Sequence, residues 1–580
     1  MSPARKPSLR GRRLARAVWR LSRVYWTSAD ARWGAVLLAA TVFLELATVY
    51  ANLLIAEAQR HAVEDLESRL ADQFLIAAGF YIAFLLLFVA TSTYRIYIRQ
   101  VLEVRWRREL TEHYVGRWIG PRAYGQSQLH GDLDNPDQRI AEDIRDFVAS
   151  ALGLSLSLLA AVATLVSFGG VLWTLSGDWR IPLDGGSLRI PGLLFWIALA
   201  AAVVMIWITN LVGRRLVPIN FDRFRFEADF RYGLVHFRDH VKEVALSQGE
   251  AVERKGAADR FQHVVDVFLQ LIRAERNLTL VTGGIGQLNA LLPLFLALPA
   301  YFAGILTLGM IVQARVAYDQ VSGSLAWFVN AYREIARWRA NVERLEAFAE
   351  VLDDTERTFA GGGIQVVRAD ADELRFRDLR LDAPVGHPLI EGMNATVRAG
   401  ERIALVGPLG KGKSTLMRAI AGIWPFGAGR IERPDVHRML FVPQQPYLPI
   451  GTLRAGVSYP APEGTFSDER IIEALRTLDI GHLAGRLDDT ESWDYALSGH
   501  EKQVLAMARV LLHEPEWVLI DDATSGLDEA TERRIYEVLL EKLPRATVIS
   551  LGARASVIDL LRRRWKLTPR PDGTMALEAA

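Results

Sequence analysis

The chain has 580 residues, and its 68 Lys and Arg against 67 Asp and Glu leave a formal net charge of +1. This balance gives no electrostatic reason to expect nucleic acid as a partner, and the absence of cysteine excludes disulfides, thiolate nucleophiles and cysteine-based metal sites. Hydrophobic residues make up 50% of the chain, which excludes a disordered protein. Long uncharged runs come first and mixed charged sequence follows, so the sequence indicates a membrane part followed by a soluble part.

Six apolar runs are long enough to cross a bilayer, which takes about 20 residues of α-helix. They are Trp33–Ala56, Gln73–Tyr94, Phe147–Leu175, Ile190–Val212, Leu278–Phe302 and Met310–Tyr332, of which the last is the least hydrophobic. These runs predict a transmembrane domain over 33–345 with six spans and two long cytoplasmic loops. The stretches between the first and second spans, Glu57–Asp72, and between the third and fourth, Ser176–Arg189, are expected to be short outer loops.

The segment 1–32 before the first span is strongly basic. Lys and Arg residues recur from Arg5 to Arg23, whereas Asp30 is the only acid. Positive charge beside a span stays on the cytoplasmic side, so the N-terminus is expected to be cytoplasmic. Apolar residues lie near helical spacing among the arginines, so this segment is either an amphipathic helix on the membrane surface or a solvated tail.

Three ionisable residues fall inside the predicted spans: Glu45 in the first, and Arg315 with Asp319 in the sixth. Charges within a membrane are costly, so such residues are candidates for function, and a wet central cavity is their expected location. Glu45 is a candidate for contact with the substrate or for binding a transported proton. Arg315 and Asp319 are one helical turn apart, so they either contact substrate or form an ion pair within the helix.

A phosphate-binding loop lies in the soluble part, after three glycines at 361–363 that mark a join. The strand-like run Arg402–Val406 precedes the loop 407–415 and the helix-like run Leu416–Ile423 follows it. Its nucleotide-binding candidates are Gly407, Gly410, Gly412, Lys413, Ser414 and Thr415. Glycines let backbone N–H groups converge on phosphate, Lys413 reaches the β- and γ-phosphates, and Ser414 can bind Mg²⁺.

The apolar run 517–520 ends in Asp521 and Asp522. A strand ending in carboxylates places an Mg²⁺-binding acid beside a phosphate-binding loop, and Asp521 is the residue we assign to that role. The alternative is a buried strand merely capped by acids. With the loop upstream, the sequence predicts a domain at 362–580 that binds a nucleotide and Mg²⁺, connected through a linker at 346–361.

These motifs, with Gln444, Leu497–Glu501 and Ser525–Asp528 in this order, resemble the ATP-binding cassette transporters. The resemblance implies that Gln444 senses the γ-phosphate and Mg²⁺, and that Asp522 holds the catalytic position. It also implies that Ser498 and Gly499 close over ATP bound by a second subunit, and that Asp528 lies at the dimer interface. The implied assembly is a homodimer in the lipid bilayer, and the implied fold is an exporter-type six-span helical domain fused to an α/β nucleotide-binding domain.

Two membrane-half segments, Asp134–Ile140 and Lys242–Glu250, look like those of BacA/SbmA-like peptide transporters with a fused cassette, which are related to peroxisomal acyl-CoA transporters. Taken alone, Asn135–Ile140 is also compatible with a loop that starts a helix. The resemblance implies uptake of peptides or other hydrophilic solutes across a bacterial inner membrane. It also implies that short helices in the cytoplasmic loops touch the cassettes, and Glu243–Gly249 is the segment we expect to form one.

Four positions depart from the cassette pattern. Asp522 stands where glutamate is usual, Ala553 where histidine is usual, His500 where a second glycine is frequent, and Asp382–Pro384 where an aromatic residue stacks on adenine. His387 is a substitute for that aromatic or a solvent-facing histidine. We therefore expect slow but non-zero hydrolysis, because phosphoryl transfer depends on positioning.

Two other functions compete with ATP-driven peptide import. A carrier driven by the proton gradient would use Glu45 and keep the cassette as a regulatory module. An exporter of lipid or acyl substrates would need an apolar cavity, against which charged lining residues would count.

Overall fold

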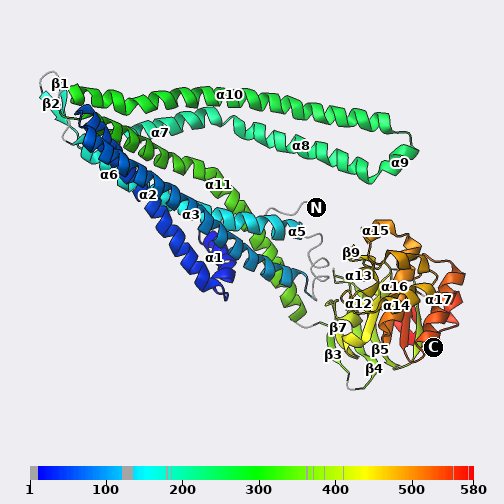
Figure 1. Cartoon of the computed structure of the whole chain (residues 1–580). Coiled ribbons are helices and arrows are strands. Elements are labelled where there is room, and N and C mark those ends of the chain that lie inside the picture. The colour runs from blue at the N-terminus through cyan, green and yellow to red at the C-terminus, as the bar shows by residue number, and fades with distance from the viewer. Residues whose placement is uncertain are drawn as a thin grey trace. The chain divides into compact units, whose positions relative to one another are not determined.

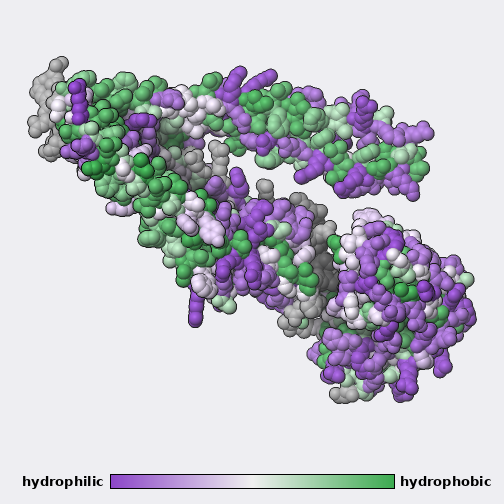
Figure 2. All heavy atoms as spheres, in the orientation of Figure 1, coloured by the Kyte–Doolittle hydropathy of each residue, from purple (hydrophilic) through white to green (hydrophobic). Residues whose placement is uncertain are grey.

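The computed structural model describes residues 11–120, 135–177, 180–183, 186–302, 304–360, 363–369, 371–384, 386–408, 410–552, 554–571 and 574–579. The chain divides into two compact units. The first comprises Met1–Tyr114 and Asp137–Glu346, and the second comprises Val115–Pro136 and Ala347–Ala580. Figure 2 shows hydrophobic residues along the helices of the first unit, whereas hydrophilic residues dominate the visible face of the second.

Long helices build the first unit (Figure 1). They are α1 (Arg12–Trp26), α2 (Ala31–Glu67), α3 (Ala71–Trp118), α5 (Pro136–Gln138), the π-helical turn η1 (Arg139–Asp143), α6 (Ile144–Ser176), α7 (Leu193–Gly213), α8 (Leu216–Asp239), α9 (Val241–Leu246), α10 (Glu250–Phe302) and α11 (Leu308–Ala360). A hairpin of β1 (Arg180–Leu183) and β2 (Gly186–Arg189) separates α6 from α7. Most of the expected outer loop Glu57–Asp72 is helical, because α2 continues to Glu67, so the connection to α3 is shorter than predicted.

Among the described residues, five helical segments are long and apolar enough to cross a membrane: α2, α3, the stretch from α5 through α6, α7 and α10. These contain the first five predicted spans, except that α7 begins three residues after the predicted start of the fourth, Ile190. The sixth, Met310–Tyr332, lies within the continuous helix α11, which is less apolar and stays a predicted span. With 53 residues, α10 is about 80 Å long, so it extends well beyond a hydrocarbon core of about 30 Å.

The helices α7, α8 and α10 leave most of their surface uncovered by their own chain. In Figure 1, α10 runs back alongside α8 and α7, and α9 connects α8 to α10. No residue of α8 is buried, and α7 buries only Leu194, Ala198 and Ala202. Exposed apolar side chains on these helices, such as Trp207 and Phe221, require lipid or another protein surface as a neighbour.

Small residues allow α2, α6, α7 and α11 to pack closely. The buried cluster contains Ala56, Phe168, Leu172, Leu194, Ala198, Ala314, Ala317, Tyr318 and Val321. Alanines at such contacts let helix backbones approach one another, which is how membrane helices associate without a hydrophobic driving force. The Tyr318 hydroxyl also donates to Asn289 Oδ1 at 2.8 Å, connecting α11 to α10.

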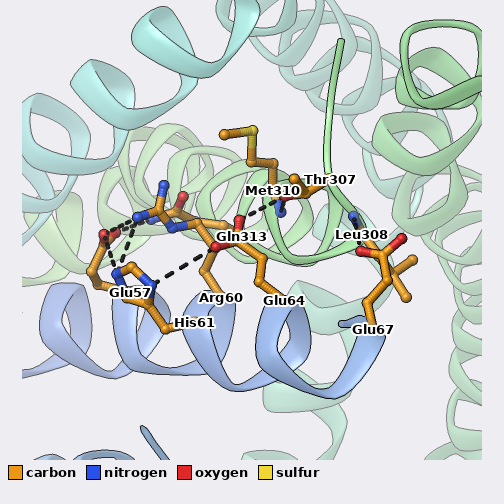
Figure 3. A network of polar contacts seen from close by, with 9 residues as sticks. All are labelled: Glu57, Arg60, His61, Glu64, Glu67, Thr307, Leu308, Met310 and Gln313. Carbon is orange, nitrogen blue, oxygen red and sulfur yellow. Dashed lines mark hydrogen bonds and ion pairs between the residues drawn. The ribbon is translucent and has the colours of Figure 1, made fainter. Parts of the chain in front are cut away.

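Carboxylates at the C-terminal end of α2 hold the turn between α10 and α11 (Figure 3). Gln313 Nε2 donates to Glu57 at 2.6 Å, Thr307 Oγ1 donates to Glu64 at 2.6 Å, and the Leu308 amide donates to Glu67 at 3.2 Å. Arg60 and His61, on the same face, pair with Glu57. This network fixes the first predicted span against the start of the last.

The basic N-terminal segment forms the amphipathic helix α1 over Arg12–Trp26, so the solvated-tail alternative is wrong for these residues. Leu21 and Tyr25 are buried, and the Tyr25 ring stacks on Trp106 of α3 at 5.8 Å between centroids. Arg20 also forms an ion pair with Glu346 of α11 at 3.0 Å. One face of α1 is therefore anchored on the helices, and the arginines of the other face stay exposed.

The segment 346–361, predicted as the linker between the two domains, is helical over most of its length, since α11 continues through Ala360. Two ion pairs brace this last part of α11 within the second unit: Arg117 at the end of α3 lies 2.8 Å from Asp353 and 2.9 Å from Glu356. Helix-forming residues between 346 and 360 continue the pattern of the preceding helix without a break.

The second unit is built on a ten-stranded sheet with the order β3-β7-β4-β5-β14-β13-β6-β12-β11-β8. The strands are β3 (Gln365–Arg368), β4 (Glu373–Asp382), β5 (Pro388–Arg398), β6 (Arg402–Val406), β7 (Gly427–Arg433), β8 (Met439–Val442), β11 (Trp517–Asp521), β12 (Thr547–Leu551), β13 (Arg563–Pro569) and β14 (Met575–Ala579). Neighbouring strands from β13 through β8 are parallel. The loops that follow β6, β8, β11 and β12 therefore meet at one edge of the sheet.

Helices cover both faces of this sheet. They are α12 (Lys413–Ala421), α13 (Leu453–Ser458), α14 (Asp468–Thr477), α15 (Trp493–Ala496), α16 (Gly499–His513), α17 (Glu529–Lys542) and α18 (Ala555–Ile558), with short elements β9 (Gly451–Thr452), β10 (Thr490–Glu491), η2 (Val436–Arg438) and η3 (Gly481–Arg486). One buried cluster joins α12 to β4, β5, β6 and β13, and a second joins α13, α14, α16 and α17 to β11 and β12. A helical domain fused to an α/β domain, as the sequence predicts, is thus the architecture observed.

Candidate functional site

The loop after β6 has the backbone of a phosphate cradle. Gly410 and Gly412 adopt φ of +72° and +94°, which side-chain-bearing residues rarely adopt. Lys413 is the first residue of α12, and its Nζ donates to the carbonyls of Gly407 at 2.8 Å and Pro408 at 2.9 Å. Its ammonium is thus held over the loop at a helix N-terminus, where positive potential and free N–H groups favour phosphate.

The residues that follow connect this loop to β11. Ser414 Oγ donates to Asp521 Oδ1 at 2.9 Å, so a hydroxyl and a carboxylate from separate elements meet at one point. Asp521 is buried, and burial raises the pKa of its carboxyl while the Ser414 hydroxyl opposes that rise. A hard divalent cation such as Mg²⁺ prefers these oxygen donors, and its charge would compensate the buried carboxylate. Thr415 follows with its side chain buried in α12.

Asp522 and Gln444 approach each other at the same edge. Gln444, in the loop after β8, donates from Nε2 to Asp522 Oδ2 at 3.3 Å. Asp522 adopts φ of +54°, a left-handed conformation that Asp tolerates better than longer side chains. The arrangement brings Lys413, Ser414 and Asp521 together with Asp522 and Gln444, as needed to bind a nucleotide phosphate chain and orient an attacking water.

Ser498 and Gly499 begin α16 in an exposed capping box. The Ser498 amide donates to Glu501 Oε2 at 2.8 Å, and the Glu501 amide donates back to Ser498 Oγ at 3.2 Å. His482 Nε2 also lies 2.8 Å from Glu501 Oε1. The Ser498 hydroxyl and amide and the neighbouring His482 lower the pKa of Glu501 to about 2, so this cap is ionised at neutral pH.

The capping box predicts an acid-dependent stability. The folded-state pKa of Glu501, about 2, lies below its ordinary value of 4.5, so its contribution is present above that value and is lost as pH falls toward 2. Replacing Glu501 by Gln should therefore lower the melting temperature at pH 7, with the difference from the native chain shrinking as pH falls below about 5. Thermal unfolding from pH 7 to pH 3 measures this. The exposed Glu541→Gln variant is the control, and a pH-independent difference would contradict the prediction.

The departures from the cassette pattern are placed as follows. His500 and His387 are both exposed. The turn at Asp382–Pro384 is held by Ala383, whose amide donates to the His387 carbonyl at 2.7 Å. Ala553 lies outside the described residues, and so does Asp134 of the segment Asp134–Ile140.

Glu45 does not lie in an open cavity, which corrects the expected location. It is 5% exposed, and Arg95 of α3 contacts its Oε1 through Nη1 at 2.6 Å. Sequence reasoning missed Arg95 because the second span was ended at Tyr94, one residue too early. A carboxylate in a membrane helix needs a counter-charge, which is the signal that would have prompted the search.

Of the other membrane-half candidates, Arg315 and Asp319 form a loose pair within α11, with Nε 4.0 Å from Oδ2 and both side chains about half exposed in this chain. The intrahelical ion pair is therefore present. Glu243 lies exposed in α9, so the short helix expected near it exists at Val241–Leu246. The segment Asn135–Ile140 begins the helical stretch that leads into α6. This agrees with the alternative interpretation of the segment as a loop that starts a helix.

Comparison with known proteins gives a consistent result for both units. The ABC transporter transmembrane region 2 family matches residues 21–302, and the ABC transporter family matches residues 390–525. An ABC transporter ATP-binding protein of Synechocystis is 34% identical over 82% of this chain and 72% of its own length. The inner membrane ABC transporter ATP-binding protein YddA of Escherichia coli is 30% identical over 82% of this chain and 84% of its own length.

Two further similarities extend over nearly the whole chain. ABC transporter D family member 2, chloroplastic, of Arabidopsis thaliana is 28% identical over 93% of this chain and 84% of its own length. The solved structure of a bacterial Atm1-family ABC exporter with ATP bound aligns with a TM-score of 0.67 and 20% identity, covering 94% of this chain and 95% of that one. Because the sequence identity to that structure is low, the last similarity shows only that the two chains share a fold.

Proposed function

This chain belongs to the ABC transporters, and we propose that two copies of it use ATP to import a peptide or similar hydrophilic solute across a bacterial inner membrane. Its cassette is an ABC-type ATPase. The observation that carries the proposal is the convergence of Lys413, Ser414 and Asp521 with Gln444 and Asp522 at one sheet edge, in a chain that also supplies membrane-spanning helices.

In the proposed ATP site, Lys413 and the loop amides bind the β- and γ-phosphates. Ser414, Gln444 and Asp521 would hold Mg²⁺, which neutralises charge that develops on the phosphates. Asp522 accepts the proton of the attacking water, and Gln444 orients that water. The side chain of Asp522 is one methylene shorter than glutamate, so we expect slow turnover.

Two features of the single chain support a homodimer. Ser498 and Gly499 are exposed at the N-terminus of α16, where they are available to close over a nucleotide held by another cassette. The uncovered apolar faces of α7, α8 and α10 also require neighbours. A second copy supplies both, and nucleotide binding would then bring the two cassettes together and change access to a cavity between the membrane halves.

Substrate class and direction rest on the BacA/SbmA-like resemblance and on the charged pair of α11. In a transport cavity between two copies, the exposed Arg315 and Asp319 would favour a polar solute, because an acyl chain gains nothing from charged neighbours. An exporter of lipid or acyl substrates remains the second candidate, favoured by the exporter fold. A proton-driven carrier is the third, although the pairing of Glu45 with Arg95 weighs against a free proton-binding carboxylate.

Uptake of a labelled basic peptide into proteoliposomes tests the proposal. ATP on the cassette side should drive uptake that falls to background in Lys413→Ala, because the ammonium over the phosphate loop is lost, and that survives collapse of the proton gradient. Lys411→Ala, which removes an exposed lysine of the same loop, is the matched control. Uptake that ignores Lys413→Ala but follows the gradient would instead establish the proton-driven carrier.

A further inference from the structure

A buried acid lies beneath the loop that follows β11. Glu532 of α17 is 2% exposed, and Thr524 Oγ1 donates to its Oε1 at 2.7 Å. Its other oxygen, Oε2, accepts no hydrogen bond from the described residues, and Arg554 Nη1 is 3.7 Å from it. Burying a carboxylate costs free energy unless a counter-charge and hydrogen bonds offset the loss of water. The contacts around Glu532 should therefore serve a specific purpose.

Arg554 binds the backbone of the same loop through two hydrogen bonds. Its Nη1 donates to the Leu527 carbonyl at 2.6 Å and its Nη2 donates to the Ser525 carbonyl at 2.5 Å. A planar guanidinium presents two donors in a fixed fork, so one side chain sets the spacing of two carbonyls. Glu532 lies behind that guanidinium and supplies its counter-charge.

The same loop begins at Asp522, the proposed catalytic acid. The Ser525 amide donates to the Asp522 carbonyl at 3.1 Å, and the Asp522 amide donates to the Leu551 carbonyl at 3.0 Å. Asp522 is therefore held from both sides in its left-handed conformation. A Cβ placed on Gly552 would lie 3.1 Å from Asp522 Oδ1, so the carboxylate also rests against the segment that leads to Arg554.

We propose that Glu532 and Arg554 are positioning residues, which fix the backbone of residues 524–527 and thereby aim the Asp522 carboxylate at the attacking water. This inference rests on the proposed ATP site. The cassette resemblance leads us to expect a histidine at position 553, where this chain has Ala553. Arg554, the next residue, instead connects the segment after β12 to the loop after β11 through its hydrogen bonds. The contacts of both residues go to this loop and to each other, and neither residue belongs to the proposed nucleotide site.

The test measures ATP hydrolysis and backbone hydrogen exchange in the full-length transporter reconstituted in nanodiscs. The variants are Glu532→Gln, which keeps an oxygen for Thr524 but removes the charge, Arg554→Ala, and Arg554→Lys, which can restore only part of the fork. The matched control is Arg533→Ala, because Arg533 neighbours Glu532 on α17 and donates to the Ser556 carbonyl at 2.9 Å without contacting the 524–527 loop.

We expect Glu532→Gln and Arg554→Ala each to lower kcat about tenfold, with KM and the Kd for a non-hydrolysable ATP analogue within about twofold of the native chain. Arg554→Lys should recover part of kcat. With the analogue bound, amide exchange over residues 523–531 should be faster in both variants. The double variant should be no slower than the worse single one, because both side chains act on one loop.

An unchanged kcat or an unchanged exchange rate would overturn the inference, because the two residues would then not position the loop. Changes that Arg533→Ala reproduces would also overturn it, because they would reflect a general loss of cassette stability. If the native chain released no phosphate above Lys413→Ala, the proposed ATPase site would fail. The exchange measurement would then decide alone whether Glu532 and Arg554 fix the loop.

Discussion

Replacing Asp522 by asparagine should lower phosphate release by about 10²- to 10³-fold while ATP binding stays within about twofold. Asparagine has the same shape, tolerates the φ of +54° found here and can keep the contact with Gln444, so the fold of the loop should persist. What is lost is the negative charge that polarises the attacking water. Phosphate release by the reconstituted protein, with binding of a non-hydrolysable analogue measured in parallel, gives both quantities.

The control for this variant is Asp378→Asn, because Asp378 is an aspartate of β4 with a similar φ of +49°. It should match the native chain in both measurements. The companion Asp522→Glu variant tests reach: an added methylene should raise turnover several-fold if the short side chain limits the reaction. Phosphate release that persists in Asp522→Asn would mean that another group activates the water, and the assignment of Asp522 would be wrong.

The phosphate-binding loop and the acid-tipped strand could be predicted because each is a local pattern. Glycine spacing, Lys413 and Ser414 all lie within one turn that connects a strand to a helix, and the backbone of that turn determines their chemistry. Asp521 was predictable for a related reason, since parallel strands bring their C-terminal ends to a common edge. The loop therefore needed only short-range geometry, and the place of Asp521 needed only the shared direction of parallel strands.

Contacts between distant segments could not be predicted in this way. Arg95 is 50 residues from Glu45, and their meeting depends on how α2 and α3 are rotated about their axes, which hydrophobic spacing alone does not determine. Arg554 is 27 residues from Leu527, and its bonds go to backbone carbonyls that carry no sequence signal. The linker at 346–361 was predicted without any secondary structure, although its residues favour helix and α11 continues through Ala360.

Removing one partner of the pair between Glu45 and Arg95 should be one of the most destabilising single substitutions in the membrane unit. Glu45→Ala would leave Arg95 without its counter-charge between two membrane helices, which costs about 3 kcal/mol, at the lower end for a broken buried pair because Arg95 is 30% exposed. The melting temperature in lipid nanodiscs should fall clearly. Arg105→Ala, which breaks the more exposed pair with Asp30 at 2.8 Å, should cost less than about 1 kcal/mol.

Two double variants separate the pair's structural role from proton chemistry. The exchange Glu45→Arg with Arg95→Glu should recover most of the lost stability, and Glu45→Leu with Arg95→Leu should be near neutral, because removing both charges also removes the desolvation penalty. If the dileucine variant keeps ATP-dependent uptake, Glu45 cannot be an obligatory proton carrier. If it stays folded and hydrolyses ATP but no longer transports, Glu45 acts in coupling or transport, and the proton-driven reading becomes the stronger one.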